Sequence, residues 1–511
     1  MKYLVKKGEM QHYDANTMEV FGMPSLVLIE RAALAAVEEL EQSLLHGGER
    51  ILIAVGTGNN GADGLVMGRL LFLKGYSVEL VLAGNREKAT SENERELTIA
   101  KNYKIPVISA TDWLEQPDPG HSYELVIDAL FGVGLSRRIE GTYEQLLTRL
   151  DELQAKKVAV DIPSGIDADN GQILGVAFHA DLTITFSYEK LGLVLFPGAE
   201  YAGRIVCKNV GIDDHSFLDG EGFGHKPQIC GLTDEDLSLL PTRRPHSNKG
   251  TYGKVLVIAG SINMAGAAIF SAKAAYLSGC GLVRVLTPEE NRTIIQSALP
   301  EAVLTTYHGK KPEPERITEA LQWADVIVCG PGLGQTQTAR QLVHTVLKEA
   351  AVPLVLDADA LNIISEDTDI LRRPHTELII TPHLGEMARL TQMPVSYLKD
   401  HLVESAQEFA RTYNLICVQK DARTVTAVPF GMTYVNLSGN NGMATGGSGD
   451  VLTGVIAALL AQGLSGDLAA PLGVYIHGRA GDLAAEKYGK YSMTASSLLE
   501  ALPGVYLTLH A

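Results

Sequence analysis

Two glycine-rich loops, one in each half of the chain, constrain the fold more than any other feature of the sequence. Their sequences are GTGNNGADG (residues 56–64) and GMATGGSGD (residues 442–450), and each leads into a helix-like run. Glycine has no Cβ, so such a loop lets backbone N–H groups approach a phosphate, and the start of the following helix adds partial positive charge. The loops therefore predict two sites for phosphate-bearing ligands in one chain.

Around the first loop, apolar segments alternate with helix-like runs. The chain opens with a helical pattern, in which Leu26, Ile29, Leu34, Val37 and Leu40 recur at roughly helical spacing. Five short, continuously apolar and β-branched segments then predict parallel strands covered by helices on both faces: residues 51–55, 78–82, 125–128, 158–161 and 182–186. The first half is therefore expected to form a Rossmann-like doubly wound sheet.

A second α/β series follows a break in this pattern. At 511 residues the chain is too long for one hydrophobic core. The Gly- and acid-rich stretch DHSFLDGEGFGH interrupts the periodicity, so we expect a linker at residues 216–225 between domains 1–215 and 226–511. Six further strands are expected, followed by a long helical C-terminus from Gly449: residues 255–259, 282–286, 325–329, 354–357, 377–381 and 415–419.

Charge and cysteine usage exclude several classes of partner. The formal net charge of −17 disfavours nucleic acid and anionic membranes, because both bind basic surfaces. The five cysteines are scattered without CxxC spacing, as expected of reduced core residues and not of a disulfide framework or a zinc site. The start of the chain has no signal-peptide pattern, and no apolar run approaches the ~18 residues of a membrane span. We therefore expect a cytoplasmic protein.

Polar residues gather where the strands of the first half are expected to end. Asn59 and Asn60 suit left-handed turn positions, and Asp63 lies where the following helix is expected to start. Asp128 and Asp161 each end an apolar segment. One such aspartate would usually be a structural cap, and the loop alone is compatible with a polar turn. Three polar turns at the carboxyl ends of strands in one sheet favour a ligand site.

The segments GTGNNGADG, DALFGVGLSRR and DIPSGIDADNG resemble the N-terminal epimerase domain of the bifunctional NAD(P)H-hydrate repair enzymes, over roughly residues 1–215. The resemblance implies that Asp161 is the acid/base and that oxygen-bearing side chains of Asn60, Asp128 and Ser164 gather a potassium ion. Ala62 stands where the family usually has glycine. The hydrated dinucleotide is expected on two segments: Asn59, Asn60, Gly61, Ala62 and Asp63, and Gly132, Val133, Gly134, Leu135, Ser136, Arg137 and Arg138.

The second glycine-rich loop carries its own carboxylate. Asp450 is expected in the first turn of an apolar helix, beside the N–H groups of Gly447, Ser448 and Gly449. An anion hole next to a base suits chemistry at a terminal phosphate, although a capping aspartate is the simpler alternative. Five further polar or glycine-rich segments accompany this loop in order: AGSINMAGAA, GPGLG, DADALN, TPHLGE and KDART.

This ordered set resembles the ribokinase-like ADP/ATP-dependent NAD(P)H-hydrate dehydratases, over about residues 226–511. The resemblance implies that Asp450 is the catalytic base and that Ala267, Gly332 and His383 line the hydrated dinucleotide. His383 alone would more often be a satisfied loop histidine. Asp421 and Asn441 depart from the family, which usually has glycine and proline there. The adenine nucleotide is expected on Lys420, Asp421, Ala422, Arg423, Thr424, Gly447, Ser448 and Gly449.

Together these resemblances predict a fused repair enzyme for NADH and NADPH that have added water at the nicotinamide ring. Its small-molecule substrates are the hydrates NADHX and NADPHX and the nucleotide ADP or ATP, and we expect a homo-oligomer. Asp357 and Glu386 are candidates to help hold the Mg²⁺ of the nucleotide, with solvated helix-start carboxylates as the equal alternative. Two other classes stay open: a small-molecule kinase in the second half, and a non-catalytic ligand scaffold in the first.

Overall fold

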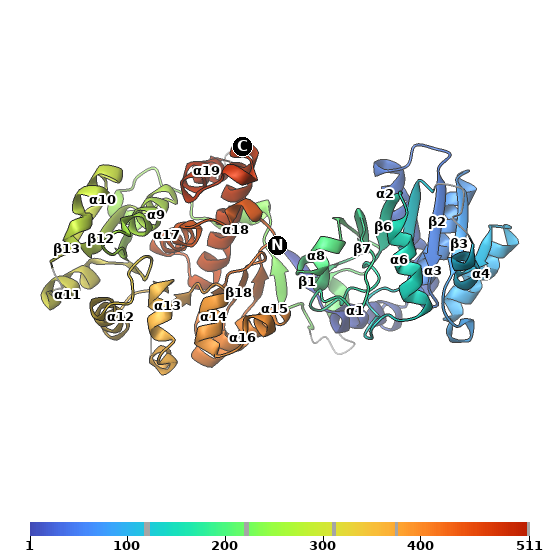
Figure 1. Cartoon of the computed structure of the whole chain (residues 1–511), viewed down its shortest axis with the longest axis horizontal. Coiled ribbons are helices and arrows are strands. Elements are labelled where there is room, and N and C mark those ends of the chain that lie inside the picture. The colour runs from blue at the N-terminus through green and yellow to red at the C-terminus, as the bar shows by residue number, and fades with distance from the viewer. Residues whose placement is uncertain (117–122, 219–223, 309–312, 374–376, 508–511) are drawn as a thin grey trace. The chain divides into compact units, whose positions relative to one another are not determined.

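The computed structural model of the chain describes residues 1–116, 123–218, 224–308, 313–373 and 377–507 (Figure 1). The chain forms two compact units, Tyr3–Pro227 and Gln228–Ala511, the second of which includes Met1–Lys2. Within the expected linker, Ser216 and Phe217 are buried, Phe217 in the core of the first unit, and residues 219–223 lie outside the described residues. Helices alternate with parallel strands in both units, which confirms the α/β class.

The first unit contains a parallel seven-stranded sheet in the order β4-β3-β2-β5-β6-β7-β9. All five segments predicted as strands are strands of this sheet, whereas the edge strands β4 and β9 escaped the sequence pattern. A separate short pair, β1 with β8, is also parallel. The bounds are β1 (Lys2–Val5), β2 (Arg50–Val55), β3 (Ser77–Leu82), β4 (Val107–Ser109), β5 (Leu125–Ala129), β6 (Lys156–Val160), β7 (Leu182–Phe186), β8 (Glu189–Lys190) and β9 (Arg204–Lys208).

Helices cover both faces of this sheet because its strands are apolar on both sides. In β2, Ile51 and Ile53 belong to the core cluster that includes α1 to α4, whereas Leu52 and Ala54 belong to the cluster that includes α5 and α6. This is a doubly wound sheet, as the sequence predicted. The helices are α1 (Lys7–Glu19), α2 (Ser25–Ser43), α3 (Asn59–Leu73), α4 (Ser91–Asn102), α5 (Ala110–Glu115), α6 (Thr142–Glu152), α7 (Leu191–Val194) and α8 (Gly198–Tyr201).

The strand order reverses next to β2. The chain passes from β2 to β3 on one side, and later returns to place β5 on the other side of β2. Loops that leave the carboxyl ends of β2 and β5 therefore part in opposite directions. Ligands of open α/β sheets bind in the crevice that such a reversal creates.

The second unit has a mixed sheet in the order β13-β12-β11-β14-β15-β16-β17-β18-β19-β10, parallel from β13 to β17. The six predicted segments are all strands, and the antiparallel strands β18 and β19 complete the sheet beyond β17. The bounds are β10 (Ile229–Gly231), β11 (Lys254–Ile258), β12 (Leu282–Pro288), β13 (Val303–Tyr307), β14 (Val326–Cys329), β15 (Leu354–Leu356), β16 (Leu378–Ile380), β17 (Ile416–Gln419), β18 (Val425–Ala427) and β19 (Thr433–Val435).

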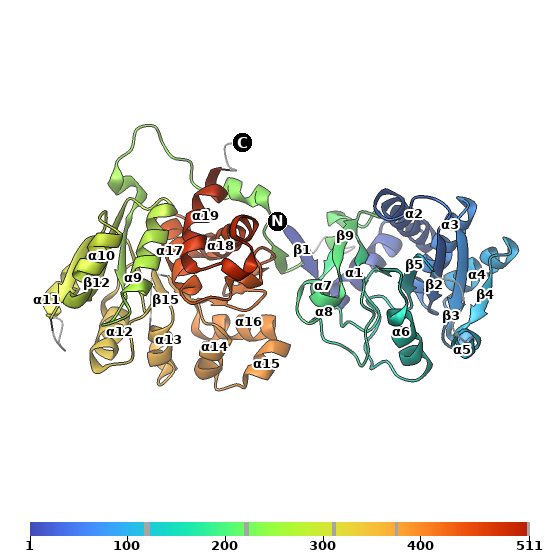
Figure 2. The ribbon, with the colours of Figure 1, turned by 45° about the horizontal axis from the view of Figure 1, so that its top comes forward.

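The helix α17 packs closely against α9, and α18 lies beside α17 (Figure 2). A Cβ on Gly454 of α17 would lie 2.1 Å from the backbone oxygen of Ser271 in α9, so the contact needs glycine. The helices are α9 (Ala265–Leu277), α10 (Arg292–Ala298), α11 (Pro314–Trp323), α12 (Gln337–Glu349), α13 (Asp359–Ile364), α14 (Leu384–Thr391), α15 (Val395–Asp400), α16 (Leu402–Tyr413), α17 (Ser448–Ala461), α18 (Gly466–Tyr488) and α19 (Ala495–Leu507).

Local geometry corrects four predictions. Asn59 and Asn60 are not in left-handed turns, because α3 begins at Asn59 and both residues are helical; Asp63 consequently lies beyond the first turn. The strand β6 ends at Val160, and Asp161 follows it with a φ of +69°, the left-handed region that side chains other than glycine rarely adopt. The helical C-terminus begins at Ser448, one residue earlier than expected.

Candidate functional sites

A cavity of about 570 Å³ lies at the carboxyl ends of β2, β5 and β6, where the strand order of the first unit reverses. Most residues predicted for the dinucleotide line it: Asn59, Asn60, Asp63, Gly132, Val133, Gly134, Leu135, Ser136, Arg137 and Asp161. Arg138 does not, and its side chain is 74% exposed. Residues from α1 and α2, which the sequence did not indicate, form another part of the wall: Met10, Gln11, Asp14, Met18, Ser25, Leu28, Ile29 and Ala32.

Gly61 and Ala62 belong to the glycine-rich loop but do not line the cavity. A Cβ on Gly61 would lie 2.2 Å from the backbone oxygen of Gly56, so this turn requires glycine. The methyl group of Ala62 is fully buried in the core, and Ala62 is absent from the cavity lining. The side chain of Asn93, in α4, donates to the backbone oxygens of Gly56 and Gly58 at 3.0 Å each. Sequence reasoning missed Asn93, which lies far along the chain.

Asp161 is held by a buried cation. One carboxylate oxygen, Oδ1, lies 2.5 Å from Nζ of Lys190, whose side chain is 1% exposed. The other oxygen, Oδ2, accepts the backbone N–H of Val133 at 3.2 Å. Lys190 also donates to the hydroxyl of Thr185 at 2.9 Å, and it lines the cavity. Lys190 is therefore part of the site, although no motif in the sequence indicated it.

Two further carboxyl groups share this cavity with Asp161. Burial raises the pKa of Asp63 well above its usual range, and the negative charges of Asp161 and Asp14 raise it further. The pKa of Asp14 is raised for the same reasons, first burial and then the charge of Asp161. Lys190 opposes both shifts. Asp63 and Asp14, whose pKa values are raised, therefore share the cavity with an ion-paired Asp161, which places three carboxyl groups and one ammonium group at the site.

The residues predicted for potassium lie beneath the same loops. The carboxylate of Asp128 is fully buried and accepts the hydroxyl and the backbone N–H of Ser164, both at 2.7 Å. The Ser164 hydroxyl in turn accepts the N–H of Phe131 at 2.9 Å. Burial raises the pKa of Asp128 to about 6. Among the described residues, both amide atoms of the Asn60 side chain are buried without a hydrogen-bond partner.

The second glycine-rich loop opens α17 as predicted. Gly447 is the left-handed residue before the helix, with a φ of +89°, and Asp450 lies in the first turn. The N–H groups of a first helical turn have no partner within the helix. Here the N–H of Ser448 donates to the backbone oxygen of Thr445 at 3.4 Å, and its hydroxyl lies 3.3 Å from Nε2 of the buried His477.

A buried ion pair lies next to this loop. Nζ of Lys420 is 2.7 Å from Oδ1 of Asp357, and a Cβ on Gly449 would lie 3.1 Å from that Nζ. Burial raises the pKa of Asp450 to about 7, with Asp357 as the next cause and Lys420 acting against it. Burial likewise raises the pKa of Glu386 to about 7. A carboxyl group with a pKa near 7 is suited to exchange protons at neutral pH.

The three residues predicted for the dinucleotide in this unit have different surroundings. Ala267 and Gly332 are neighbours, since a Cβ on Gly332 would lie 2.7 Å from the methyl of Ala267. His383 caps α14: Nδ1 accepts the N–H of Gly385 at 2.9 Å, and Nε2 lies 3.3 Å from Oε1 of Glu386. Burial lowers the pKa of His383, and both ring nitrogens have partners.

The segment predicted for the adenine nucleotide connects β17 to β18. Asp421 and Ala422 are exposed, so water screens the charge of Asp421. Arg423 donates to the backbone oxygen of Leu437 at 3.2 Å, and Thr424 accepts the N–H of Asn436 at 2.9 Å. These contacts join the segment to the chain that leads into the glycine-rich loop.

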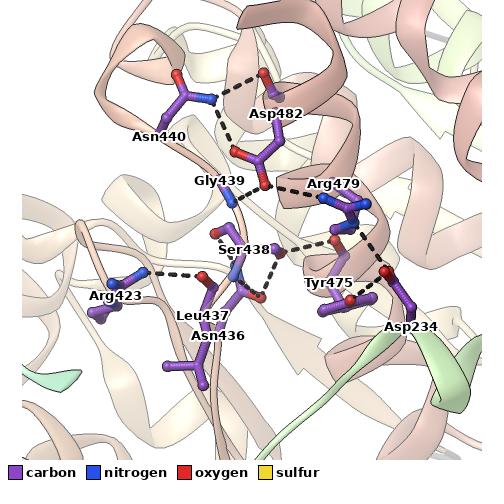
Figure 3. Close-up of polar contacts among 11 residues, drawn as sticks. Asp234, Arg423, Asn436, Leu437, Ser438, Gly439, Asn440, Tyr475, Arg479 and Asp482 are labelled. Atoms are coloured by element: carbon purple, nitrogen blue, oxygen red, sulfur yellow. Dashed lines mark hydrogen bonds and ion pairs between the residues drawn. The ribbon is translucent and has the colours of Figure 1, made fainter. Parts of the chain in front are cut away.

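A polar network holds residues 436–440, which precede that loop (Figure 3). Asp482 of α18 accepts the N–H of Gly439 at 3.0 Å and the side-chain amide of Asn440 at 3.1 Å. The Ser438 hydroxyl donates to the backbone oxygen of Tyr475, also in α18, at 3.0 Å. The approach to the loop is thereby tied to the helix that packs beside α17, although the sequence gave no signal for Asp482.

The described residues show neither a cluster of metal-binding side chains nor a membrane-spanning helix. No group of three or more histidine, cysteine, aspartate or glutamate side chains is arranged to hold a metal ion among the residues with described positions. Within the same ranges, no helix has the length and apolar character needed to cross a membrane.

Comparison with known proteins identifies relatives of both halves. A family model described as NAD(P)H-hydrate dehydratase matches residues 255–504, and one described as YjeF-related protein N-terminus matches residues 25–192. The bifunctional NAD(P)H-hydrate repair enzyme of Moorella thermoacetica is 37% identical, over 99% of this chain and 97% of its own. The enzyme of the same name from Escherichia coli is 35% identical, over 98% and 92%.

A solved structure supports the fold of the second half. The ribokinase-like superfamily protein from Enterococcus faecalis is 30% identical, with a TM-score of 0.51, and the match covers 56% of this chain and 98% of that protein. The ribokinase-like fold expected from the sequence is therefore confirmed.

Proposed function

Because the chain belongs to the family of bifunctional NAD(P)H-hydrate repair enzymes, we propose that its two sites divide the two reactions of that repair. The protein epimerises the R and S hydrates of NADH and NADPH, and it dehydrates the S hydrate to NAD(P)H with hydrolysis of ADP or ATP. We assign epimerisation to residues 1–215 and dehydration to residues 226–511, joined by residues 216–225. A dehydratase specific for one epimer would otherwise leave the other hydrate unrepaired.

Asp161 is the acid/base of the epimerase. Epimerisation inverts the carbon that bears the ring hydroxyl, so a bond to that carbon must break and re-form while a proton leaves and returns. The observation that carries this assignment is the ion-paired Asp161 carboxylate in the wall of the 570 Å³ cavity. The segments Gly132–Arg137 and Asn59–Asp63 would hold the dinucleotide, and Arg137 would offset pyrophosphate charge.

Potassium fits beneath the epimerase site. The buried amide oxygen of Asn60 has no hydrogen-bond partner among the described residues, and Asp128 and Ser164 supply a carboxylate and a hydroxyl. Oxygen donors of these kinds suit a hard monovalent cation. Bound there, potassium would offset carboxylate charge next to the pyrophosphate of the substrate.

Asp450 is the base of the dehydratase. We infer that its carboxylate takes the proton of the ring hydroxyl while that oxygen attacks the terminal phosphoryl group of the nucleotide. The nucleotide leaves one phosphoryl group shorter. Phosphate then leaves the ring carbon with the electron pair of the C–O bond, far more readily than hydroxide would, and loss of a proton from the neighbouring ring carbon re-forms the double bond of NAD(P)H. The N–H groups at the start of α17 would stabilise charge on the transferred group, and the pKa of about 7 lets Asp450 accept a proton at neutral pH.

The nucleotide would lie on Lys420–Thr424 and Gly447–Gly449, with Ala267, Gly332 and His383 towards the hydrate. Its Mg²⁺ would be held chiefly by the phosphates, with Asp357 and Glu386 as the nearby carboxyl groups. Asp357 is already paired with Lys420, so we give the larger part to the phosphates.

One experiment tests both assignments. Purified R and S hydrates are incubated with the protein and with ADP, ATP or no nucleotide, while dihydronicotinamide absorbance and each epimer are followed separately. We expect S to be consumed only with nucleotide, and R to be converted to S with or without it. A stable phosphorylated product would instead indicate a small-molecule kinase, and saturable hydrate binding without exchange of epimers would indicate a scaffold.

We further propose that the protein acts in the cytoplasm as a homo-oligomer, without nucleic acid or membrane partners. The net charge of −17 supports the absence of nucleic acid and anionic membrane partners. Light scattering of the protein as it elutes from a size-exclusion column tests the oligomeric state, and a mass equal to one chain would exclude a homo-oligomer.

A further inference from the structure

Lys190 has no role in the assignments above, and its surroundings are unusual for a lysine. Its side chain is 1% exposed, and Nζ contacts the Asp161 carboxylate at 2.5 Å, the Thr185 hydroxyl at 2.9 Å and the Phe186 backbone oxygen at 3.1 Å. Lysine is rarely buried to this extent unless it is paired. We propose that Lys190 is a positioning residue of the epimerase, which holds Asp161 ionised and in place for proton transfer.

The placement of Lys190 is built into the fold. It is the last residue of β8, a two-residue strand that pairs in parallel with β1, where Val5 is opposite Lys190. Val5 is itself fully buried. A dedicated short strand pair thus fixes the backbone from which the lysine reaches Asp161.

Asp161 needs such a partner for geometric reasons. Its φ of +69° is costly for a residue with a Cβ, and strain of this kind persists only where surrounding contacts determine the conformation. The ammonium group of Lys190 fixes Oδ1, and the N–H of Val133 fixes Oδ2. Both carboxylate oxygens are therefore oriented by groups on different elements.

The charges around Asp161 make a cation necessary as well. Asp14 from α1 and Asp63 from α3 face the same cavity, and Arg137 lines it from the loop after β5. Negative charge on Asp161 contributes to the raised pKa of both neighbours, so the three carboxyl groups repel one another when ionised. Lys190 stabilises negative charge on Asp161 more than on its two neighbours, because it contacts the Asp161 carboxylate directly.

The chemical consequence is a division of roles. Asp161 stays a carboxylate and accepts the substrate proton, and Lys190 acts only through Asp161. Without the ammonium group, the three carboxyl groups would face one another with no cation in contact with Asp161, and a proton would be shared among them. The turnover number and the acid limb of the pH profile should therefore depend on Lys190 more than substrate binding does.

This inference rests on the proposed epimerase function, so every variant is compared with wild type measured first. Lys190→Met keeps the length of the side chain without its charge, and Lys190→Arg keeps the charge. Lys208→Met is the matched control, since Nζ of Lys208 also pairs with a carboxylate, that of Glu39 at 2.7 Å, but neither residue lines the cavity. Consumption of R hydrate is measured from pH 5 to 9, and folding is checked by thermal unfolding.

We expect Lys190→Met to lower kcat by about 100-fold with KM changed less than about threefold, and to move the acid limb to higher pH. Lys190→Arg should keep the acid limb of wild type, and Lys208→Met should match wild type throughout. A folded Lys190→Met protein with an unchanged acid limb would overturn the proposal. If that variant does not fold, an acid limb displaced in Lys190→Arg would overturn it. Failure of wild type to exchange epimers would instead refute the epimerase function itself.

Discussion

Replacing Asp450 with asparagine should abolish dehydration while making the second unit more stable at neutral pH. The substitution removes the proposed base and keeps nearly the same shape at the start of α17. Loss of a general base typically lowers the rate by ~10² to 10⁴. We therefore expect nucleotide-dependent consumption of the S hydrate to fall by at least about 100-fold, while the exchange of R and S continues in the other unit.

The stability gain follows from the pKa of Asp450. Burial and the charge of Asp357 raise it from the ordinary 3.8 to about 7, so the folded unit binds a proton more tightly than the unfolded chain does. Stability conferred by that proton is present at low pH and is lost as pH rises from about 4 to 7. The full difference corresponds to about 4 kcal/mol, and partial exposure of the side chain reduces our expectation to about 2 kcal/mol.

The measurement needs a signal from the second unit alone. The chain has two tryptophans, Trp113 in the first unit and Trp323 in the second, so a Trp113→Phe background lets fluorescence report urea unfolding of the second unit. The advantage of Asp450→Asn should grow between pH 5 and 7 and level off above pH 7. Asp400→Asn, at an exposed position in α15, is the control and should change neither quantity. An advantage that does not vary with pH, or dehydration retained in the variant, would refute the reasoning.

Three further outcomes are expected. Asp161→Asn should stop the use of R hydrate beyond its spontaneous epimerisation but spare dehydration of S hydrate, as separation of the two epimers by chromatography will show. Exchange of potassium for tetramethylammonium should weaken epimerisation but leave the pH profile of the reaction, which we attribute to the pair of Lys190 and Asp161, unchanged. Equal epimerase rates in both salts would contradict the potassium site at Asn60. Ala62→Gly should lower the free energy of unfolding of the first unit by about 2 kcal/mol, from helix propensity and the loss of a buried methyl group. Because that methyl group faces the core, KM for the hydrates should stay within about twofold of wild type. Tryptophan fluorescence in a Trp323→Phe background reports the unfolding of this unit.

The sequence predicted well the elements whose signal is local. Every apolar segment proposed as a strand is a strand, because continuous β-branched runs covered on both faces have few alternatives. The edge strands β4, β9 and β13, the short pair β1 and β8, and the three-residue strands β10, β18 and β19 escaped prediction, since short segments away from the centre of a sheet carry little apolar pattern. The left-handed assignment of Asn59 and Asn60 was wrong because the helix begins immediately after Gly58, and tertiary contacts from Asn93 fix the turn.

Residues of the sites that depend on distant contacts were not predictable from local pattern. Lys190 follows β7, which pairs with β6 next to Asp161, and its own strand β8 pairs with β1. Asp482 accepts the N–H of Gly439 from α18, which packs beside α17. Neither residue stands in a motif. By contrast, Asp161 lies at the end of a predicted strand, and Asp450 lies in a glycine-rich loop before a predicted helix. In both cases position along the chain already indicates position in the fold.

The two glycine-rich loops enter their helices by different turns, since Gly58 before α3 is extended with a φ of −90° and Gly447 before α17 is left-handed with a φ of +89°. In the first, α3 begins with the amide side chains of Asn59 and Asn60, and its acidic residue, Asp63, lies deeper, where burial raises its pKa. The proposed proton acceptor, Asp161, follows another strand, β6, and pairs with Lys190. In the second, Asp450 lies in the first turn of α17, beside the N–H groups that we propose bind the phosphate. A base needed for phosphoryl transfer is best placed in the loop that binds the phosphate. A base that acts on the nicotinamide ring, at the other end of a dinucleotide, is best placed on a different strand.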